Sequence, residues 1–170
     1  MAAAAAIDYE DKRVHVLDDS SSPDICAAAA LHGCNYIART QRSDAKAGNL
    51  NHALSRTSGD LILTLDADQV PDTDILRRMV GFFGLAKVGL VQSKQRMIVP
   101  EGDPFGNKDE FFYDVMQPSK DSDNSAFSCG SGVIYRRSAL EETGGFSTWN
   151  LVEDVHTTLQ LHQRGWKTVY

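Results

Sequence analysis

Apolar residues in the first ninety positions gather in short runs that alternate with alanine-rich or amphipathic segments. Runs of this length, rich in Val, Ile and Leu, are typical of buried strands. They predict strands at 14–17, 35–38, 61–65 and 88–91, with helices between them at 24–31, 47–56 and 71–83. Strands that alternate with helices favour an α/β domain with a mixed, mainly parallel sheet and helices on both faces.

The pattern is less regular in the second half of the chain. Two polar segments, 100–107 and 120–125, predict connections, and 110–116 predicts a helix between them. The remaining elements are a strand at 131–136, a short helix capped by Ser138 and ended by Gly144-Gly145, a helix at 152–164 and a last strand at 167–170. The whole chain fits one α/β domain.

Composition narrows the classes of protein that this chain can represent. Apolar residues make up 42% and charged residues 24% of 170, as in soluble globular proteins. The net charge of −6 excludes broad binding to nucleic acid. Three cysteines without metal-ligand spacing favour free thiols in a reducing compartment. The alanine run at the start predicts that residues 1–13 are a tag or a frayed N-terminus.

Two acidic clusters follow directly on predicted strands. They are Asp18-Asp19 and Asp66-Ala67-Asp68, and in a parallel sheet both would lie at the rim where ligands bind. Residues two apart on an extended chain point to the same side, so Asp66 and Asp68 are expected to aim at one point. Mg²⁺ binds one or two carboxylates together with phosphate oxygens. The second cluster therefore predicts a site for a metal and a diphosphate.

Three other interpretations of the acidic clusters remain open at this stage. An apolar strand followed by Asp66-Ala67-Asp68 is also typical of haloacid-dehalogenase-type phosphatases, although there the loop follows the first strand. Asp18-Asp19 is compatible with a phosphorylated receiver domain, with Lys167 as a poor candidate for its lysine. The third interpretation is a non-catalytic nucleotide-binding or scaffold module, in which the acids are solvated strand ends.

Further segments occur in a characteristic order along the chain. They are Leu-Asp-Asp-Ser-Ser at 17–21, Lys-Ala-Gly-Asn-Leu-Asn at 46–51, Asp-Ala-Asp-Gln-Val-Pro at 66–71, Phe-Ser-Cys-Gly-Ser-Gly at 127–132, Gly-Gly-Phe at 144–146 and Val-Glu-Asp-Val-His-Thr at 152–157. Together they resemble family 2 glycosyltransferases, in particular the cellulose synthase and hyaluronan synthase branch. The resemblance covers residues 14–170, which we expect to be a partial catalytic domain.

The resemblance implies a GT-A fold and inverting transfer of a hexose from a UDP-sugar, with UDP-glucose favoured, to a growing β-glycan. It also implies a role for individual residues. Asp154 matches the general base, Asp18 and Asp19 the uridine-contacting pair, Lys46 the diphosphate ligand, Asp66 and Asp68 the residues that bind Mg²⁺ or Mn²⁺, and Cys129, Gly130, Ser131 and Glu153 the region near the acceptor.

The chain departs from the family pattern in two places. Val152 stands where the family has the threonine of its Thr-Glu-Asp motif, and the Gln-x-x-Arg-Trp motif is absent. Residues 163–166 lack the spacing of that motif, which we expect beyond Tyr170. We therefore expect a soluble fragment with little activity, from a polysaccharide-synthesising parent embedded in the cell membrane with this domain on its cytoplasmic face.

Overall fold

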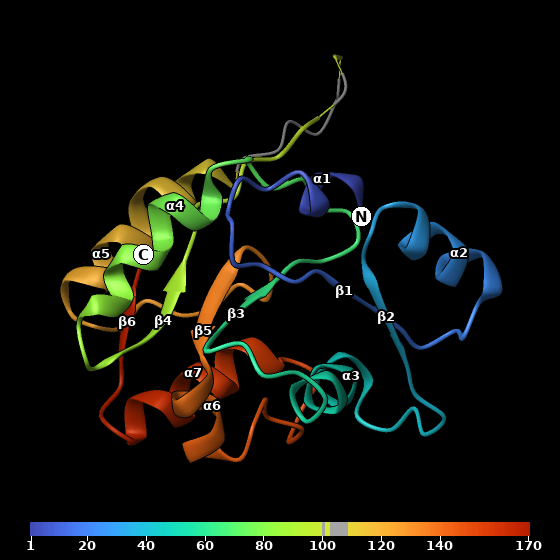
Figure 1. Cartoon of the computed structure of the whole chain (residues 1–170). Coiled ribbons are helices and arrows are strands. Elements are labelled where there is room, and N and C mark those ends of the chain that lie inside the picture. The colour runs from blue at the N-terminus through green and yellow to red at the C-terminus, as the bar shows by residue number, and fades with distance from the viewer. Residues whose placement is uncertain (100, 103–108) are drawn as a thin grey trace.

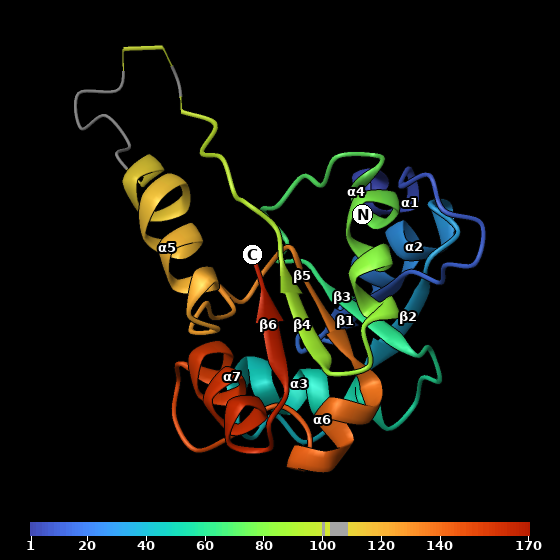
Figure 2. The same cartoon turned by 90° about the vertical axis from the view of Figure 1, so that its left-hand side faces the viewer.

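The computed structural model describes residues 1–99, 101–102 and 109–170. Its elements are α1 Ala2–Ala5, β1 His15–Asp18, α2 Pro23–Leu31, β2 Asn35–Ala38, α3 Ala45–Leu54, β3 Leu61–Thr64, α4 Ile75–Met79, η1 Val80–Gly84, β4 Val88–Gln92, η2 Phe112–Met116, α5 Gln117–Ser122, β5 Val133–Arg136, α6 Arg137–Thr143, α7 Glu153–Gln163 and β6 Lys167–Val169 (Figures 1 and 2). The predicted strands are all present, and the predicted α/β class is confirmed.

The strands form two sheets. β1 and β2 pair in parallel, and the other four have the order β3-β5-β4-β6. β4 and β6 are parallel, but β5 runs antiparallel to both of its neighbours, β3 and β4. The sheet is therefore mixed, and less parallel in its pairings than the sequence suggested. The hydrophobic run of β5 has the same appearance in either direction, so its orientation was not visible in the sequence.

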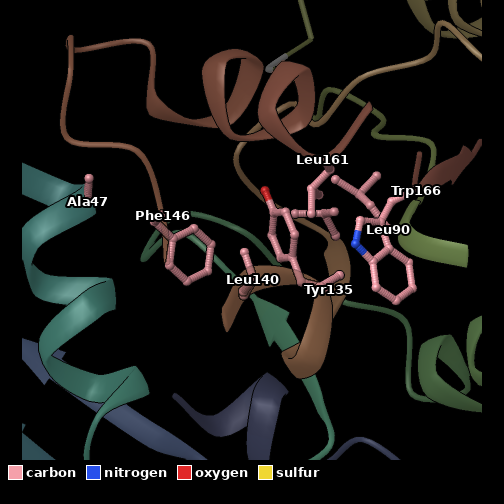
Figure 3. Close-up of a cluster of buried hydrophobic side chains, with 9 residues drawn as sticks. Ala47, Leu90, Tyr135, Leu140, Phe146, Leu161 and Trp166 are labelled. Carbon is pink, nitrogen blue, oxygen red and sulfur yellow. The ribbon is translucent and has the colours of Figure 1, made fainter. Parts of the chain in front are cut away.

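Helices cover both faces of the larger sheet, as predicted. On one face, Leu90 and Tyr135 pack with residues of α3, α6 and α7 in a buried cluster that also contains Trp166 (Figure 3). On the other face, Val91 and Ile134 pack against α4 and η1. Adjacent residues of one strand enter opposite clusters because side chains alternate across a sheet. This double burial explains the continuous apolar runs of β4 and β5.

Several element boundaries differ from those predicted; for example, α3 covers 45–54 rather than 47–56. The helix expected over 71–83 is a shorter α4 followed by the 3₁₀ helix η1. Part of the polar segment 120–125, expected as a connection, continues helix α5 to Ser122. A cap at Ser138 would start the next helix at Ala139, but α6 begins two residues earlier, at Arg137; it ends as predicted at Gly144, which has a positive φ of 86°. Most of the predicted loop 100–107 lies outside the described residues.

Two of the first residues contact the rest of the domain. Ile7 is buried, the Asp8 N–H donates to the Thr73 carbonyl at 2.6 Å, and the Asp8 carboxylate pairs with Arg77. The division of the chain at residue 13 remains a prediction. Within the described part of the chain, every helix is too short or too polar to cross a membrane.

Candidate functional site

The antiparallel direction of β5 creates the centre of the site. Because Thr64 at the end of β3 pairs with Val133 at the start of β5, the segment 127–132 lies beside the segment that follows β3. The Asp66 N–H donates to the Ser131 hydroxyl at 2.9 Å, and the Gly132 N–H donates to the Thr64 carbonyl at 2.9 Å. Two motifs far apart in the sequence thus meet at one end of the sheet.

The acidic pair after β3 lies in a turn, which corrects the expectation of an extended strand. β3 ends at Thr64, and the Gln69 N–H donates to the Asp66 carbonyl at 3.1 Å. Residues 66–69 lie beyond the last paired residues of β3 and β5, so the chain is free to turn there. The Asp68 side chain is exposed, and within the described residues it makes neither a hydrogen bond nor an ion pair. Asp66 and Asp68 both lie in this turn, with Ala67 between them. The alternation of side chains along a strand therefore does not explain where they lie.

Lys46 joins three separate segments. It lies in the first turn of α3, and its Nζ is 2.6 Å from Asp66 Oδ1, 3.0 Å from the Gly130 carbonyl and 3.7 Å from Glu153 Oε1. The lysine and Asp66 side chains are both partly exposed, whereas the Glu153 side chain is only 12% exposed. Lys46 therefore holds a positive charge at the point where these segments converge, and an arriving ligand can still reach that charge.

Asp154 approaches the same glycine. It occupies the first turn of α7, where its Oδ1 accepts the Val155 N–H at 2.8 Å. A Cβ atom built on Gly130 would lie 3.1 Å from Asp154 Oδ2 and 3.2 Å from Lys46 Nζ. Gly130 also has a positive φ of 79°. A side chain here would enter the space between the carboxylate and the ammonium group.

Buried polar side chains fix the segment 127–132. The Gln92 amide accepts the Cys129 N–H at 2.7 Å and donates to the Ser131 carbonyl at 3.0 Å. The Gln117 amide contacts Phe127 and the thiol of Cys129, and the Ser128 hydroxyl accepts the Gly130 N–H. Burial raises the pKa of the Cys129 thiol, so it stays neutral and is poorly suited to act as a nucleophile. The sequence analysis missed the two glutamines, because polar residues on a buried strand or in a helix carry no motif.

The acidic pair after β1 has a different environment. Asp18 is buried, and its two oxygens accept hydrogen bonds from the Ser20 N–H and hydroxyl, the Ser22 N–H and the Tyr36 hydroxyl. Those hydrogen bonds, the Ser20 hydroxyl first, hold the pKa of Asp18 well below its usual range. In turn Asp18 raises the pKa of Tyr36 to about 12. Ser22 precedes α2, but its side chain makes no capping hydrogen bond.

Asp19 pairs with a buried arginine instead. Arg39 Nε and Nη2 donate to the two carboxylate oxygens at 2.6 and 2.7 Å, which lowers the pKa of Asp19. The same guanidinium donates to the Ser43 and Ala45 carbonyls at the start of α3. Arg39, which the sequence analysis missed, therefore connects the first acidic pair to the helix that carries Lys46.

Two small-residue positions allow α3 to approach its neighbours. A Cβ atom on Gly48 would lie 2.4 Å from the Arg39 guanidinium and 2.2 Å from the Ser43 carbonyl. A Cβ on Gly145 would lie 2.4 Å from Asn51 Oδ1, which accepts the Phe146 N–H at 2.7 Å. In the Lys-Ala-Gly-Asn-Leu-Asn segment, Gly48 and Asn51 therefore serve the packing of α3, whereas Lys46 belongs to the candidate site.

Sequence relatives identify the family to which this domain belongs. The model of glycosyl transferase family 2 matches residues 1–144. The chain is 41% identical over 172 residues to cellulose synthase 1 of Komagataeibacter xylinus, which covers 95% of this chain and 11% of that protein. It is 38% identical over 181 residues to the cellulose synthase catalytic subunit (UDP-forming) of Xanthomonas axonopodis pv. citri (strain 306), with 99% and 25% covered. The chain belongs to glycosyl transferase family 2, and it spans a quarter or less of the length of these relatives.

Solved structures agree with this assignment. A mannosyltransferase from Pyrobaculum calidifontis in complex with GDP-Man and Mn²⁺ superposes with a TM-score of 0.75 at 25% identity, over 96% of this chain and 47% of that one. Glucosyl-3-phosphoglycerate synthase from Mycobacterium tuberculosis, solved with Mn²⁺ and UDP, has a TM-score of 0.68 at 17% identity, over 99% and 63%. The GT-A fold is confirmed, and the phosphatase and receiver interpretations are set aside.

The described residues fit a metal that needs substrate to complete its coordination. Nowhere in the described ranges do three or more His, Cys, Asp or Glu side chains gather as a metal site. The turn instead offers the carboxylates of Asp66 and Asp68, one already neutralised by an ammonium group. Two hard oxygen ligands and open space suit Mg²⁺ or Mn²⁺ held jointly with phosphate oxygens.

Proposed function

We propose that this domain transfers a hexose from a UDP-sugar, with UDP-glucose favoured, to a growing β-glycan, with inversion at the anomeric carbon. The observation that carries the proposal is the convergence on Lys46 of Asp66, Gly130 and Glu153. A cation, a metal-binding turn and a separate carboxylate on α7 are the parts that such a displacement needs. The relatives named as UDP-forming cellulose synthases support the choice of donor.

Asp66 and Asp68 would bind Mg²⁺ or Mn²⁺ together with the diphosphate. When bound, the metal supplies positive charge for the leaving group. Lys46 has a second role at the same place, because its ammonium group can leave Asp66 and pair with a phosphate oxygen when the metal neutralises the carboxylate. Solved neighbours that hold Mn²⁺ with a nucleotide or nucleotide sugar support this assignment.

Of the first acidic pair, Asp19 is the better candidate to contact uridine. A carboxylate has about four lone-pair positions. Hydrogen bonds within the protein occupy all four of them on Asp18, but Arg39 uses only two on Asp19, whose side chain is 36% exposed. We therefore propose that the Asp19 carboxylate accepts a hydrogen bond from the N–H of the uracil ring. Asp18 instead holds the loop in shape.

Asp154 is proposed as the general base that takes the proton of the acceptor hydroxyl. Its Oδ2 lies 3.1 Å from the position of the missing Cβ of Gly130, and Lys46 Nζ lies 3.2 Å from the same position. The base and the leaving group must lie on opposite sides of the sugar in an inverting displacement. Glu153 and the segment from Cys129 to Ser131 would form the wall beside the acceptor, with Cys129 contributing its backbone rather than its thiol.

The parent protein is proposed to be a membrane-embedded polysaccharide synthase, with residues 14–170 as part of its catalytic domain on the cytoplasmic face. Relatives four or more times longer, named as cellulose synthases, support this placement. The isolated domain is expected to bind donor and metal with little transfer activity.

Calorimetric titration with UDP tests the proposal directly. We expect binding to this chain in the presence of Mn²⁺ and much weaker binding with EDTA. Asp154→Asn should leave that binding unchanged and abolish glucose transfer in a longer protein that contains this domain. Binding of UDP that is indifferent to Mn²⁺, or no binding at all, would contradict the proposal.

A further inference from the structure

The two tryptophans of the chain have opposite environments. Trp166 is 9% exposed, belongs to the core and donates its indole N–H to Glu142 at 2.9 Å. Trp149 is 76% exposed, although burial of an indole would be favourable. Leu151 and Val152 beside it are 86% and 54% exposed. Contiguous exposed apolar residues of this kind often mark a binding surface.

Trp149 is nevertheless held in place. The His156 ring lies 4.8 Å from the indole at an angle of 30°, which is close to stacking and covers one face of the indole. His156 Nδ1 is 2.5 Å from the hydroxyl of buried Ser147. The same hydroxyl accepts a hydrogen bond from the backbone N–H of Trp149 at 3.3 Å. The Ser147 N–H donates to Thr157 on α7 at 2.9 Å. A buried polar residue thus fixes the indole to the helix that carries Asp154.

The loop that presents Trp149 is also a wall of the site. Its neighbours Thr148, Asn150 and Leu151 line a cavity of about 300 Å³ together with Lys46 and Glu153. The loop therefore has one side on this cavity, while its indole stays open to solvent. A ligand that extends from the cavity past the loop would meet the indole.

We propose that Trp149 is an acceptor-binding residue on which a pyranose ring of the β-glycan stacks. Pyranoses linked β-1,4 present flat C–H faces, which match an open aromatic face, and their hydroxyl groups can pair with Lys46, Asn150 and Glu153 in the adjoining cavity. This proposal rests on the proposed function, since it assumes that a glycan reaches Asp154. It adds a residue that lies outside all of the family motifs in this chain and that selects the shape of the acceptor.

Tryptophan fluorescence can test this role, because Trp166 is buried and Trp149 is the responsive indole. In the presence of UDP and Mn²⁺, cellotetraose should shift the emission of the wild-type chain to shorter wavelength in a saturable way, and maltotetraose should bind more weakly. Cellotetraose binding measured by calorimetry should weaken about tenfold or more in Trp149→Ala. Trp149→Phe should retain part of it.

The matched control is Leu31→Ala, which removes an 83% exposed apolar side chain from α2 and should bind cellotetraose normally. Calorimetry with UDP and Mn²⁺ on the same samples separates the two proposals. If wild type binds UDP but no cellotetraose, or if Trp149→Ala binds the sugar as wild type does, the role of Trp149 is refuted and the proposed function stands. If wild type binds no UDP, the proposed function fails and this role with it.

Discussion

The two acidic pairs look alike in the sequence and differ in the structure. Asp18 is buried and its oxygens are fully hydrogen-bonded, and Asp19 is clamped by Arg39. Among the described residues, the Asp66 carboxylate contacts only the ammonium group of Lys46, and the Asp68 side chain is exposed. An acid whose hydrogen bonds are already made inside the protein stabilises a loop, whereas one with free lone pairs can bind a cation. The availability of these lone pairs therefore separates the acids that stabilise a loop from the acids that we propose to bind the metal.

Replacing Asp66 should give the largest effect. Asp66→Asn removes the charge that a divalent cation needs, so the Mn²⁺-dependent gain in UDP affinity should fall by about a hundredfold or more, measured by calorimetry. The fold should persist because the Asp66 N–H bond to Ser131 does not use the side chain. The control is Asp72→Asn, an exposed acid four residues beyond Asp68. Equal Mn²⁺ dependence in both variants would remove Asp66 from the metal site.

Lys46→Met tests whether Lys46 moves from Asp66 to a phosphate oxygen when the metal binds. Without the ammonium group at 2.6 Å, Asp66 should bind Mn²⁺ alone more tightly, while UDP with Mn²⁺ binds about tenfold more weakly. Opposite signs in these two titrations are the diagnostic result. Lys167→Met, at an exposed position at the start of β6, should change neither affinity. A change of the same sign in both titrations would contradict the exchange.

Asp18→Asn should act on stability. Its amide N–H₂ would face the Ser22 N–H and Tyr36 hydroxyl donors, so Tm should fall by several degrees while Mn²⁺-dependent UDP binding is largely kept. The folded-state pKa of Asp18 lies below the ordinary 3.8, so its stabilisation is present above that pH and is lost as the pH falls through the folded-state pKa.

Thermal unfolding at about pH 7 and pH 3 measures this contribution. Wild type should lose more Tm between the two than Asp18→Asn does, and the exposed Asp11→Asn should follow wild type. A variant at position 18 with normal Tm but no UDP binding would show that Asp18 is a ligand contact.

Tyr36→Phe is the smallest change. It removes one of the hydrogen bonds to Asp18 and keeps the ring, so Tm should fall by only about 2–4 °C. UDP affinity should be unaffected, as read from the same calorimetric titration. A larger fall than in Asp18→Asn would mean that Tyr36 stabilises the β1–β2 sheet by some other contact.

Sequence periodicity predicted the strands well because each is a compact apolar run between polar turns. The family resemblance also assigned Lys46, Asp66, Gly130 and Glu153 to one site, and the structure brings these residues together. It could not predict the direction of β5, since a run such as Val-Ile-Tyr-Arg is apolar whichever way it pairs. That direction decides which end of β5 meets β3, and hence why Ser131 lies against Asp66.

The supporting polar residues were invisible for a different reason. Gln92 lies on a fully buried strand and Gln117 in a helix, and a single glutamine in either context predicts nothing. Their function depends on a partner segment, 127–132, that approaches only in three dimensions. Arg39 is similar, because half of its hydrogen bonds are to backbone carbonyls, which leave no trace in the sequence.

Gly130 leaves open a space that two groups of the proposed site share. The position of its missing Cβ lies 3.1 Å from Asp154 Oδ2 and 3.2 Å from Lys46 Nζ, so the proposed base and the ammonium group both face it. The positive φ of 79° also makes this backbone conformation unfavourable for any residue with a side chain. A single added methyl group would therefore crowd the proton acceptor and the diphosphate ligand together, and it could be accommodated only by moving one of them.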